Sequence, residues 1–209
     1  MVENTIIINQ ITYDLTELEV LTWGLLKNGA VKPKDGFHTA CVATVDEDNE
    51  ATARTVILRK SDGETKTLFF HTDTRSRKFQ HLKRNPKLTL LFYDAHRHLQ
   101  LSIKTKVSLY EDGKMADERW HTTHPKSRRS FMTLQPPGAP TELPLSGYEK
   151  RFDHAEPTDA ESNIFRDNFA VVACKVVQLE FLYLNNGGNR RAVFNYENSL
   201  CVSAQWLVP

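Results

Sequence analysis

The sequence lacks the long apolar segments, the leader-like start and the one-sided charge that mark several classes of protein. Its longest apolar stretches, such as Phe169–Cys174 and Leu88–Tyr93, fall far short of the roughly 20 residues that a membrane-spanning helix needs. Residues 1–9 have no basic flank and no long apolar run, so no signal peptide is expected. Lys and Arg total 27 against 26 Asp and Glu, which gives no general basic field for nucleic acid.

Cysteine is scarce, and the familiar catalytic and metal-binding motifs are missing. Cys41, Cys174 and Cys201 are far apart, and each lies in an apolar, strand-like segment. This spacing predicts reduced, buried thiols of a cytoplasmic protein rather than disulfides or a metal site. The sequence has no His-Glu-x-x-His motif, no paired-cysteine spacing and no Ser-His-Asp order, so neither a metal nor a protein nucleophile is expected.

Helix signals are limited to a few segments. Asp14 and Glu17 form a capping-box pair ahead of leucines at helical spacing, and Asn28-Gly29 is a stop signal, so a helix is predicted over residues 14–29. Other helices are predicted over residues 76–84, 112–132 with an interruption at 124–125, and 159–167. Residues 134–158 are rich in proline and are predicted to form a long, loop-rich arm.

Most of the remaining chain has the composition and alternation of β-strands. The alternation is clearest from Leu99 through Leu101 and Ile103, where polar residues take the positions between. Strands are predicted over residues 38–45, 51–58, 67–72, 87–94, 99–110, 169–177, 179–184 and 191–196. Short turns between them and few helices predict a single, mainly β domain over residues 1–209, in the form of a small closed barrel with helices outside.

Two basic segments carry the chemistry that a phosphate group requires. One is the strand Arg54-Thr-Val-Ile-Leu-Arg59-Lys60, and the other is His71-Thr-Asp-Thr-Arg-Ser-Arg-Lys78, where a strand meets a helix. Hydroxyls, helix-start amides and fixed cations together suit a phosphate dianion. A solvated charged surface is the alternative for the second segment, whereas Arg54 lies in an apolar strand and needs a partner. Strict alternation places Arg54 and Arg59 on opposite faces unless a bulge intervenes.

Taken in order, these segments resemble the pyridoxamine 5′-phosphate oxidases. The shared motifs are Arg-x-Val-Ile-Leu-Arg, Phe-Phe-His-Thr-Asp-x-x-Ser-Arg-Lys, Asn-Pro, a strand carrying Gln100, Leu179-Glu180-Phe181, the pair Arg190-Arg191 and the final Trp206-Leu207-Val208-Pro209. The resemblance covers roughly residues 37–209. It implies an FMN-binding split β-barrel that works as a homodimer, with flavin mononucleotide (FMN) at the interface between the two copies.

The resemblance also implies three groups of FMN contacts. The phosphate contacts are Arg54, Thr72, Ser76, Arg77 and Lys78. The ring contacts are the backbone of Thr55, Val56, Ile57 and Leu58, together with Arg59 in place of the usual lysine and His71 in place of the usual tyrosine. The contacts that serve the opposite end of the flavin are Gln100, Arg128, Arg129 and Arg191.

The substrate segment departs from the oxidase pattern. Where those enzymes have Tyr-x-x-x-Arg-Pro-x-x-Ser, which binds the vitamin B6 phosphate, this chain has Trp120-His-Thr-Thr-His124-Pro-Lys-Ser-Arg128. Trp120, His124 and Arg128 are the substrate contacts predicted here. The Arg-x-His signature of the family's tail is not recognisable in Arg190–Phe194. An altered substrate site is therefore predicted, which leaves open whether pyridoxamine phosphate is the substrate.

The predicted function is therefore that of a cytoplasmic, FMN-dependent oxidoreductase that acts on a small molecule and binds neither nucleic acid nor membrane. A flavin-binding or flavin-sensing protein without catalytic activity is one alternative, because its cofactor residues would be identical. A nucleic-acid-binding barrel that uses the basic segments 75–87 and 126–129 is another, although the near-neutral net charge counts against it.

Overall fold

The computed structural model describes residues 4–209, which form two compact units. Unit 1 contains the described residues up to 70 together with 87–107 and 173–209, and unit 2 contains 71–86 and 108–172. The strands are β1 Ile6–Ile8, β2 Ile11–Tyr13, β3 Thr39–Val45, β4 Ala51–Ile57, β5 Lys60–Asp62, β6 Thr67–Asp73, β7 Lys87–Asp94, β8 Leu99–Tyr110, β9 Phe169–Tyr183, β10 Arg190–Glu197 and β11 Leu200–Leu207. The α-helices are α1 Leu15–Val31, α2 Arg77–Arg84, α3 Gly113–Thr122, α4 Pro125–Arg128 and α5 Asp159–Asn163. Short 3-10 turns are η1 Gly36–His38, η2 Arg129–Phe131, η3 Lys150–Asp153 and η4 Arg166–Asn168.

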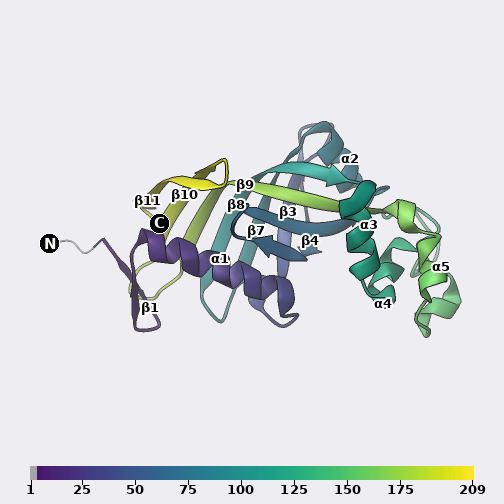
Figure 1. Cartoon of the computed structure of the whole chain (residues 1–209), viewed down its shortest axis with the longest axis horizontal. Helices are drawn as coiled ribbons and strands as arrows, with labels where there is room; N and C mark the ends of the chain where they lie inside the picture. The colour runs from purple at the N-terminus through teal and green to yellow at the C-terminus, as the bar shows by residue number, and fades with distance from the viewer. Residues whose placement is uncertain (1–3) are drawn as a thin grey trace. The chain divides into compact units, whose positions relative to one another are not determined.

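One antiparallel sheet dominates unit 1 (Figure 1). Its strands follow the order β11-β10-β9-β8-β7-β3-β4, and β6 pairs with both β9 and β5. The two ends of this path, β11 and β4, do not pair with each other among the described residues, so the expectation of a closed barrel is wrong. The reason lies just after β4 ends at Ile57. There the chain turns away from β3, and the Arg59 amide donates to the Phe69 carbonyl of β6 at 2.8 Å.

Helix α1 confirms its predicted start but not its predicted end. The Glu17 amide donates to the Asp14 carboxylate at 2.8 Å and the Asp14 amide donates to the Glu17 carboxylate at 3.0 Å, which completes the capping box. The helix continues through Asn28-Gly29 to Val31. A Cβ on Gly29 would lie only 2.5 Å from the Phe37 carbonyl oxygen, so this glycine permits close packing of η1 rather than ending the helix.

Asp14→Ala is expected to destabilise the protein by about 1 kcal/mol, because it removes the side-chain acceptor for a helix-start amide. Urea unfolding followed by circular dichroism would measure the loss. Thr16→Ala, an exposed change in the same turn, should leave the midpoint within experimental error. An equal midpoint for the Asp14 variant and the wild type would contradict the importance of the capping box.

The sheet follows the predicted strands, with a few differences. Alternation in β8 is confirmed, since Leu99, Leu101 and Ile103 are buried while their neighbours face outward. The predicted strands 169–177 and 179–184 are one continuous strand, β9, because Gln178 stays in register opposite Asn195 of β10. Strands β1, β2, β5 and β11 were not predicted: the first three have three residues each, and β11 is almost wholly exposed.

The three cysteines are free, as predicted, but only one of them is buried. Cys174 lies in the core of β9, where burial raises the pKa of its thiol. Cys41 is half-buried and Cys201 is exposed. The prediction of three buried thiols is wrong, and for Cys201 the reason is that β11 is an edge strand exposed along most of its length. In residues 4–209 no helix has the length and apolar composition needed to cross a membrane.

Unit 2 has a small aromatic core. The ring centroids of Trp120 and Phe169 lie 5.2 Å apart, and those of Phe131 and Phe169 lie 5.1 Å apart, all in edge-on arrangements. Phe79 and Phe152 are also buried within this unit. These rings give α2, α3 and the chain after α3 apolar surface to pack on.

Candidate functional site

The start of α2 gathers hydroxyl and ammonium groups in unit 2. The Ser76 hydroxyl lies 3.2 Å from that of Thr72 and donates to the Asp73 carbonyl at 2.7 Å, and the Lys78 ammonium lies 3.5 Å from it. Ser76 is the N-cap residue of α2, yet its side chain makes no capping hydrogen bond. The side chain therefore leaves the helix-start amides to other acceptors, and a helix start favours an anion.

A set of contacts that was not predicted holds this turn in place. Arg75 donates to both carboxylate oxygens of Asp73, at 3.0 and 2.7 Å. It also donates to the carbonyl and the hydroxyl of Thr133, at 2.9 Å each. These contacts tie residues 73–76 to the beginning of the arm. The Asp73-x-Arg75 spacing was the available sequence signal, whereas Thr133 could not be found without the fold.

Arg54 is held by threonine oxygens in unit 1. Its Nη1 donates to the Thr44 hydroxyl at 2.6 Å and to the Thr52 carbonyl at 3.0 Å, and its Nη2 donates to the Thr52 hydroxyl at 2.7 Å. The side chain is half-buried, and burial lowers the pKa of the guanidinium. Arg54 therefore has the partners that a cation in an apolar strand needs, and all of them are neutral. They fix the orientation of the guanidinium without cancelling its charge.

Residues 55–59 lie at and just beyond an edge of the sheet. Val56 and Leu58 are buried, whereas Thr55, Ile57 and Arg59 are exposed. Strand β4 has β3 as its one neighbour among the described residues, so the other backbone edge of β4 is open. Arg59 follows the bend at which the chain joins β6, so the alternation of β4 ends before it.

His71 and Arg77 lie at opposite sides of the predicted phosphate turn in the sequence and differ in exposure. The His71 ring is half-buried and meets Phe169 edge-on at 4.7 Å between centroids. Arg77 is exposed at the first position of α2. Both belong to unit 2, as do Thr72, Ser76 and Lys78.

Gln100 and Arg191 line one cavity of about 270 Å³ in unit 1. Its other lining residues are Leu91, Ser102, Glu180 and Leu182. Arg191 Nε donates to the Glu180 carboxylate at 3.1 Å, and Nη2 donates to the same oxygen. Arg190 instead donates to the carbonyls of Gly188 and Asn189, so Arg191 is the arginine that faces the Gln100 cavity.

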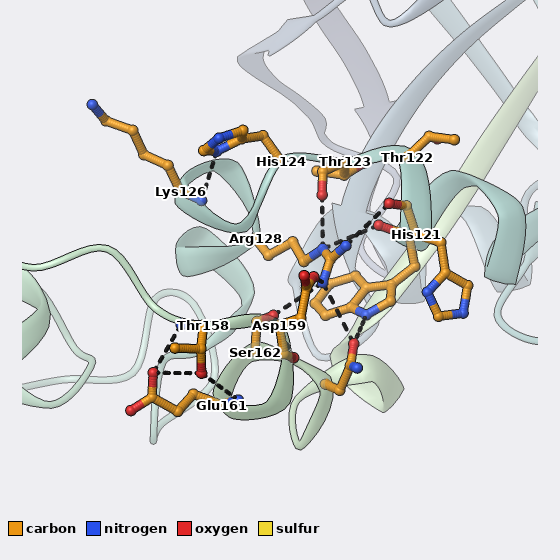
Figure 2. A network of polar contacts seen from close by, with 12 residues as sticks. His121, Thr122, Thr123, His124, Lys126, Arg128, Thr158, Asp159, Glu161 and Ser162 are labelled. Atoms are coloured by element: carbon orange, nitrogen blue, oxygen red, sulfur yellow. Dashed lines mark hydrogen bonds and ion pairs between the residues drawn. The ribbon is translucent and has the colours of Figure 1, made fainter.

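Arg128 is fully engaged by its own unit (Figure 2). Nε donates to the carbonyls of Trp120 at 3.1 Å and Thr123 at 2.7 Å, and Nη2 donates to that of His121 at 3.1 Å. Nη1 reaches the carboxylate of Asp159 at 2.7 Å and the hydroxyl of Ser162 at 3.1 Å. The residue is only 2% exposed, so it links α3, α4 and α5 from the inside.

The other two predicted substrate residues also have protein partners. Trp120 is 1% exposed and donates its indole N–H to Asn163 at 2.7 Å. The His124 ring accepts from the Lys126 amide at 3.2 Å, which caps the short helix α4. Trp120, His124 and Arg128 therefore all serve the local structure in the geometry seen here.

Arg129 joins the arm to the same region. Its Nη1 donates to the Phe152 carbonyl at 2.6 Å, and its guanidinium lies 5.4 Å from the centre of the Tyr148 ring. The arm itself encloses an open hollow of about 620 Å³, lined by residues 133–141, 144–148, 150 and 153. Apart from the turn η3, this segment has no regular secondary structure, as predicted.

No group of three or more His, Cys, Asp or Glu residues within the described range is arranged to hold a metal ion. Polar side chains gather in three separate places: at the start of α2, around Arg54 and in the Gln100 cavity. Hydroxyls with a helix start suit a phosphate, and a glutamine beside apolar walls suits the edge of a polar ring.

Comparison with known proteins places the chain in a family. Residues 30–143, just over half of the chain, match the family model described as pyridoxamine 5′-phosphate oxidase. The pyridoxine/pyridoxamine 5′-phosphate oxidase of Proteus mirabilis is 32% identical over 181 residues, which cover 75% of this chain and 82% of that protein. The enzyme of the same name from Serratia proteamaculans is 48% identical over 52 residues, which cover 25% of this chain and 23% of that one.

Solved structures show the same fold. A pyridoxamine 5′-phosphate oxidase-related, FMN-binding protein from Nostoc punctiforme matches with a TM-score of 0.70 at 21% identity, over 91% of this chain and 96% of that one. PhzG from Burkholderia lata, in complex with tetrahydrophenazine-1-carboxylic acid, matches with a TM-score of 0.68 at 15% identity, over 91% of each chain. The predicted mainly β, split-barrel fold class is confirmed, and this chain belongs to the pyridoxamine 5′-phosphate oxidase family.

Proposed function

We propose that this protein binds FMN and acts as an FMN-dependent oxidoreductase. The observation that carries the proposal is the start of α2, where Thr72, Ser76 and Lys78 come together beside a helix terminus whose N-cap side chain makes no capping hydrogen bond. That donor set fits a phosphate monoester dianion. Arg54, oriented by neutral threonine oxygens, is proposed as a further phosphate ligand, with Arg77 at the outer side.

The flavin ring is proposed to lie along the open edge of β4. Free backbone donors and acceptors between Thr55 and Leu58 suit the polar edge of an isoalloxazine ring. Gln100 and Arg191 are proposed to contact the opposite end of a flavin that is bound mainly by a second copy. A homodimer follows from this assignment, and sedimentation of the purified protein would measure it.

When bound, FMN would supply the two-electron chemistry, and the protein would supply position and polarity around the ring. The substrate is proposed to be a small molecule other than a B6 phosphate, because Trp120 and Arg128 are buried and committed to protein partners. The fold does not restrict the choice, since PhzG is seen with a phenazine carboxylic acid.

The test is the visible absorption spectrum of the purified protein, followed by mass identification of any released chromophore. Flavin bands with about one FMN per chain are expected, either as purified or after FMN is added. A colourless protein that takes up no FMN would contradict the proposal, and a steep salt dependence of DNA binding would then support a nucleic-acid-binding protein.

A flavin-binding protein without catalytic activity is the second candidate, and it is favoured by the same full engagement of Arg128. Reduction of the bound FMN by NAD(P)H or an amine, followed by reoxidation with oxygen, distinguishes the two. Turnover supports the oxidoreductase. Bound FMN that none of these donors reduces supports the binding protein.

A further inference from the structure

We propose that Arg75 is a positioning residue for the FMN phosphate, which links the turn 73–76 to the arm so that each stabilises the other. The inference rests on the proposed function, because it takes the start of α2 as the phosphate site. Arg75 lies at a position that the motif shared with the oxidases leaves unspecified, so the link is a property of this chain. All the residues that form it belong to unit 2.

The first half of the link runs from Arg75 to the hydroxyl of Ser76. The Asp73 carboxylate is only 5% exposed, and it accepts from Arg75 Nε at 3.0 Å, from Nη2 at 2.7 Å and from the Arg75 amide at 2.8 Å. The carbonyl of the same aspartate accepts from the amide of Ser76 at 3.1 Å and from its hydroxyl at 2.7 Å. The planar guanidinium therefore fixes the shape of the turn that presents the Ser76 hydroxyl.

The second half of the link runs from Arg75 to the stretch that leads into the arm. Nη1 donates to the Thr133 carbonyl and Nη2 to the Thr133 hydroxyl, both at 2.9 Å. Another path ends nearby: the Thr74 amide donates to the Asn168 carbonyl at 2.9 Å, and the Asn168 side-chain amide donates to the Phe131 carbonyl at 2.8 Å. Two separate sets of hydrogen bonds thus connect the turn with this stretch.

The arm has little apolar packing to hold it in place. Leu134, Leu143 and Leu145 are all largely exposed. The Leu134 amide donates to the Gly147 carbonyl at 2.8 Å, which closes the neck of the arm. A segment with few buried apolar contacts opens at a low cost in free energy, so the contacts of Arg75 beside this neck contribute much of its stability.

A phosphate bound at the start of α2 would couple the turn to the arm. Phosphate oxygens that accept from the Ser76 hydroxyl hold the turn in its present shape, and in this shape Arg75 reaches Thr133. Coupling between two sites is reciprocal, so the factor by which FMN stabilises the closed arm is also the factor by which the closed arm strengthens FMN binding. Riboflavin lacks the phosphate and should not be coupled to the arm.

The experiment measures dissociation constants for FMN and riboflavin, from quenching of flavin fluorescence, in wild type, Arg75→Lys, Thr133→Val and the double variant. Lysine keeps a positive charge beside Asp73 but lacks the planar group that contacts Asp73 and Thr133 together. Thr133→Val keeps Arg75 and removes one acceptor. The matched controls are Arg84→Lys, at an exposed position of α2, and Thr122→Val, whose hydroxyl donates to a carbonyl of its own helix.

Arg75→Lys is expected to weaken FMN binding by about tenfold and Thr133→Val by about threefold, with riboflavin binding and both controls within about twofold of wild type. The double variant should bind FMN about as weakly as Arg75→Lys, because both substitutions break the same link.

Three results would overturn the proposal. Wild-type FMN affinity in Thr133→Val would show that the contact with the arm has no influence on the phosphate. Wild-type FMN affinity in Arg75→Lys would show that charge alone suffices at this position. An equal loss of riboflavin binding would show that the substitutions damage the structure as a whole.

Hydrogen exchange of the arm is the second readout, followed by mass spectrometry of peptides from residues 134–148. Saturating FMN is expected to slow exchange in this segment about tenfold in the wild type, and riboflavin should leave it unchanged. In Arg75→Lys the exchange should be fast with or without FMN. A merely structural role for Arg75 would speed exchange in the variant but would not make the wild-type arm respond to FMN, so an arm that ignores FMN contradicts the link.

The same measurements separate this proposal from the proposed function. If FMN binds equally well to all the proteins, the proposed function stands and the role of Arg75 is wrong. If none of them binds FMN, the proposed function fails, and exchange is then measured with inorganic phosphate. Slower exchange of the arm in the wild type, but not in Arg75→Lys, would still support the link, and an arm that does not respond in either protein would overturn it.

Discussion

Arg54→Met is expected to weaken FMN binding by about 100-fold, the largest effect of any single substitution at the proposed cofactor site. The guanidinium is oriented by Thr44 and Thr52, and no carboxylate among its hydrogen-bond partners competes for it. Two charge-assisted hydrogen bonds to a phosphate, each worth about 1.5 kcal/mol at the low end of their usual range, account for a loss of that size. Quenching of FMN fluorescence on titration with protein would measure it.

The matched control is Arg84→Met, which removes an exposed arginine at the end of α2. It should leave the dissociation constant of FMN within about twofold of that of the wild type. Thermal unfolding of the FMN-free proteins tests whether the variant loses affinity only because it is less stable, since loss of the threonine contacts could loosen the β3–β4 pair. Wild-type affinity in a folded Arg54→Met protein would exclude Arg54 from the phosphate site.

Arg128→Met is expected to destabilise unit 2 by about 3 kcal/mol or more. The substitution leaves the carbonyls of Trp120, His121 and Thr123 without their donor, and an unsatisfied buried acceptor costs roughly 1–3 kcal/mol. It also removes the contact to Asp159 that joins α4 to α5 (Figure 2). The loss would appear as a lower midpoint of urea unfolding followed by tryptophan fluorescence, because Trp120 belongs to this network.

Lys126→Met, two positions away, is the control for Arg128→Met. Lys126 is largely exposed and pairs with the exposed Glu156 at 3.4 Å, so its loss should cost at most a few tenths of a kcal/mol. An Arg128→Met protein with wild-type stability and weakened FMN binding would show that Arg128 serves the flavin, as the family resemblance implies, and not the fold.

Local signals in the sequence predicted much of the fold, because the physics that sets them is local. The Asp14–Glu17 box marks a helix start through hydrogen bonds between neighbouring residues. Alternation in β8 marks a half-buried strand in the same way. The prediction that α1 ends at Gly29 was wrong because the role of this glycine is not local. It depends on packing against Phe37 of the following turn.

The candidate site was predicted only in part, since side-chain identity does not reveal side-chain partners. The segment from Thr72 to Lys78 is contiguous, so its convergence at a helix start follows from the sequence. The partners of Arg128 come from residues up to 35 positions away in the chain. The pairing of Glu180 with Arg191 depends on a strand register that no motif encodes.

The open edge of β4 has a further consequence for how the protein behaves without its cofactor. An unpaired strand edge is a template on which another chain can add a strand, and it promotes aggregation. The backbone groups proposed to meet the flavin ring are those that an incoming strand would use. If FMN binds as proposed, cofactor and self-association compete for one surface, and the FMN-free protein is then the form that needs protection during synthesis and purification.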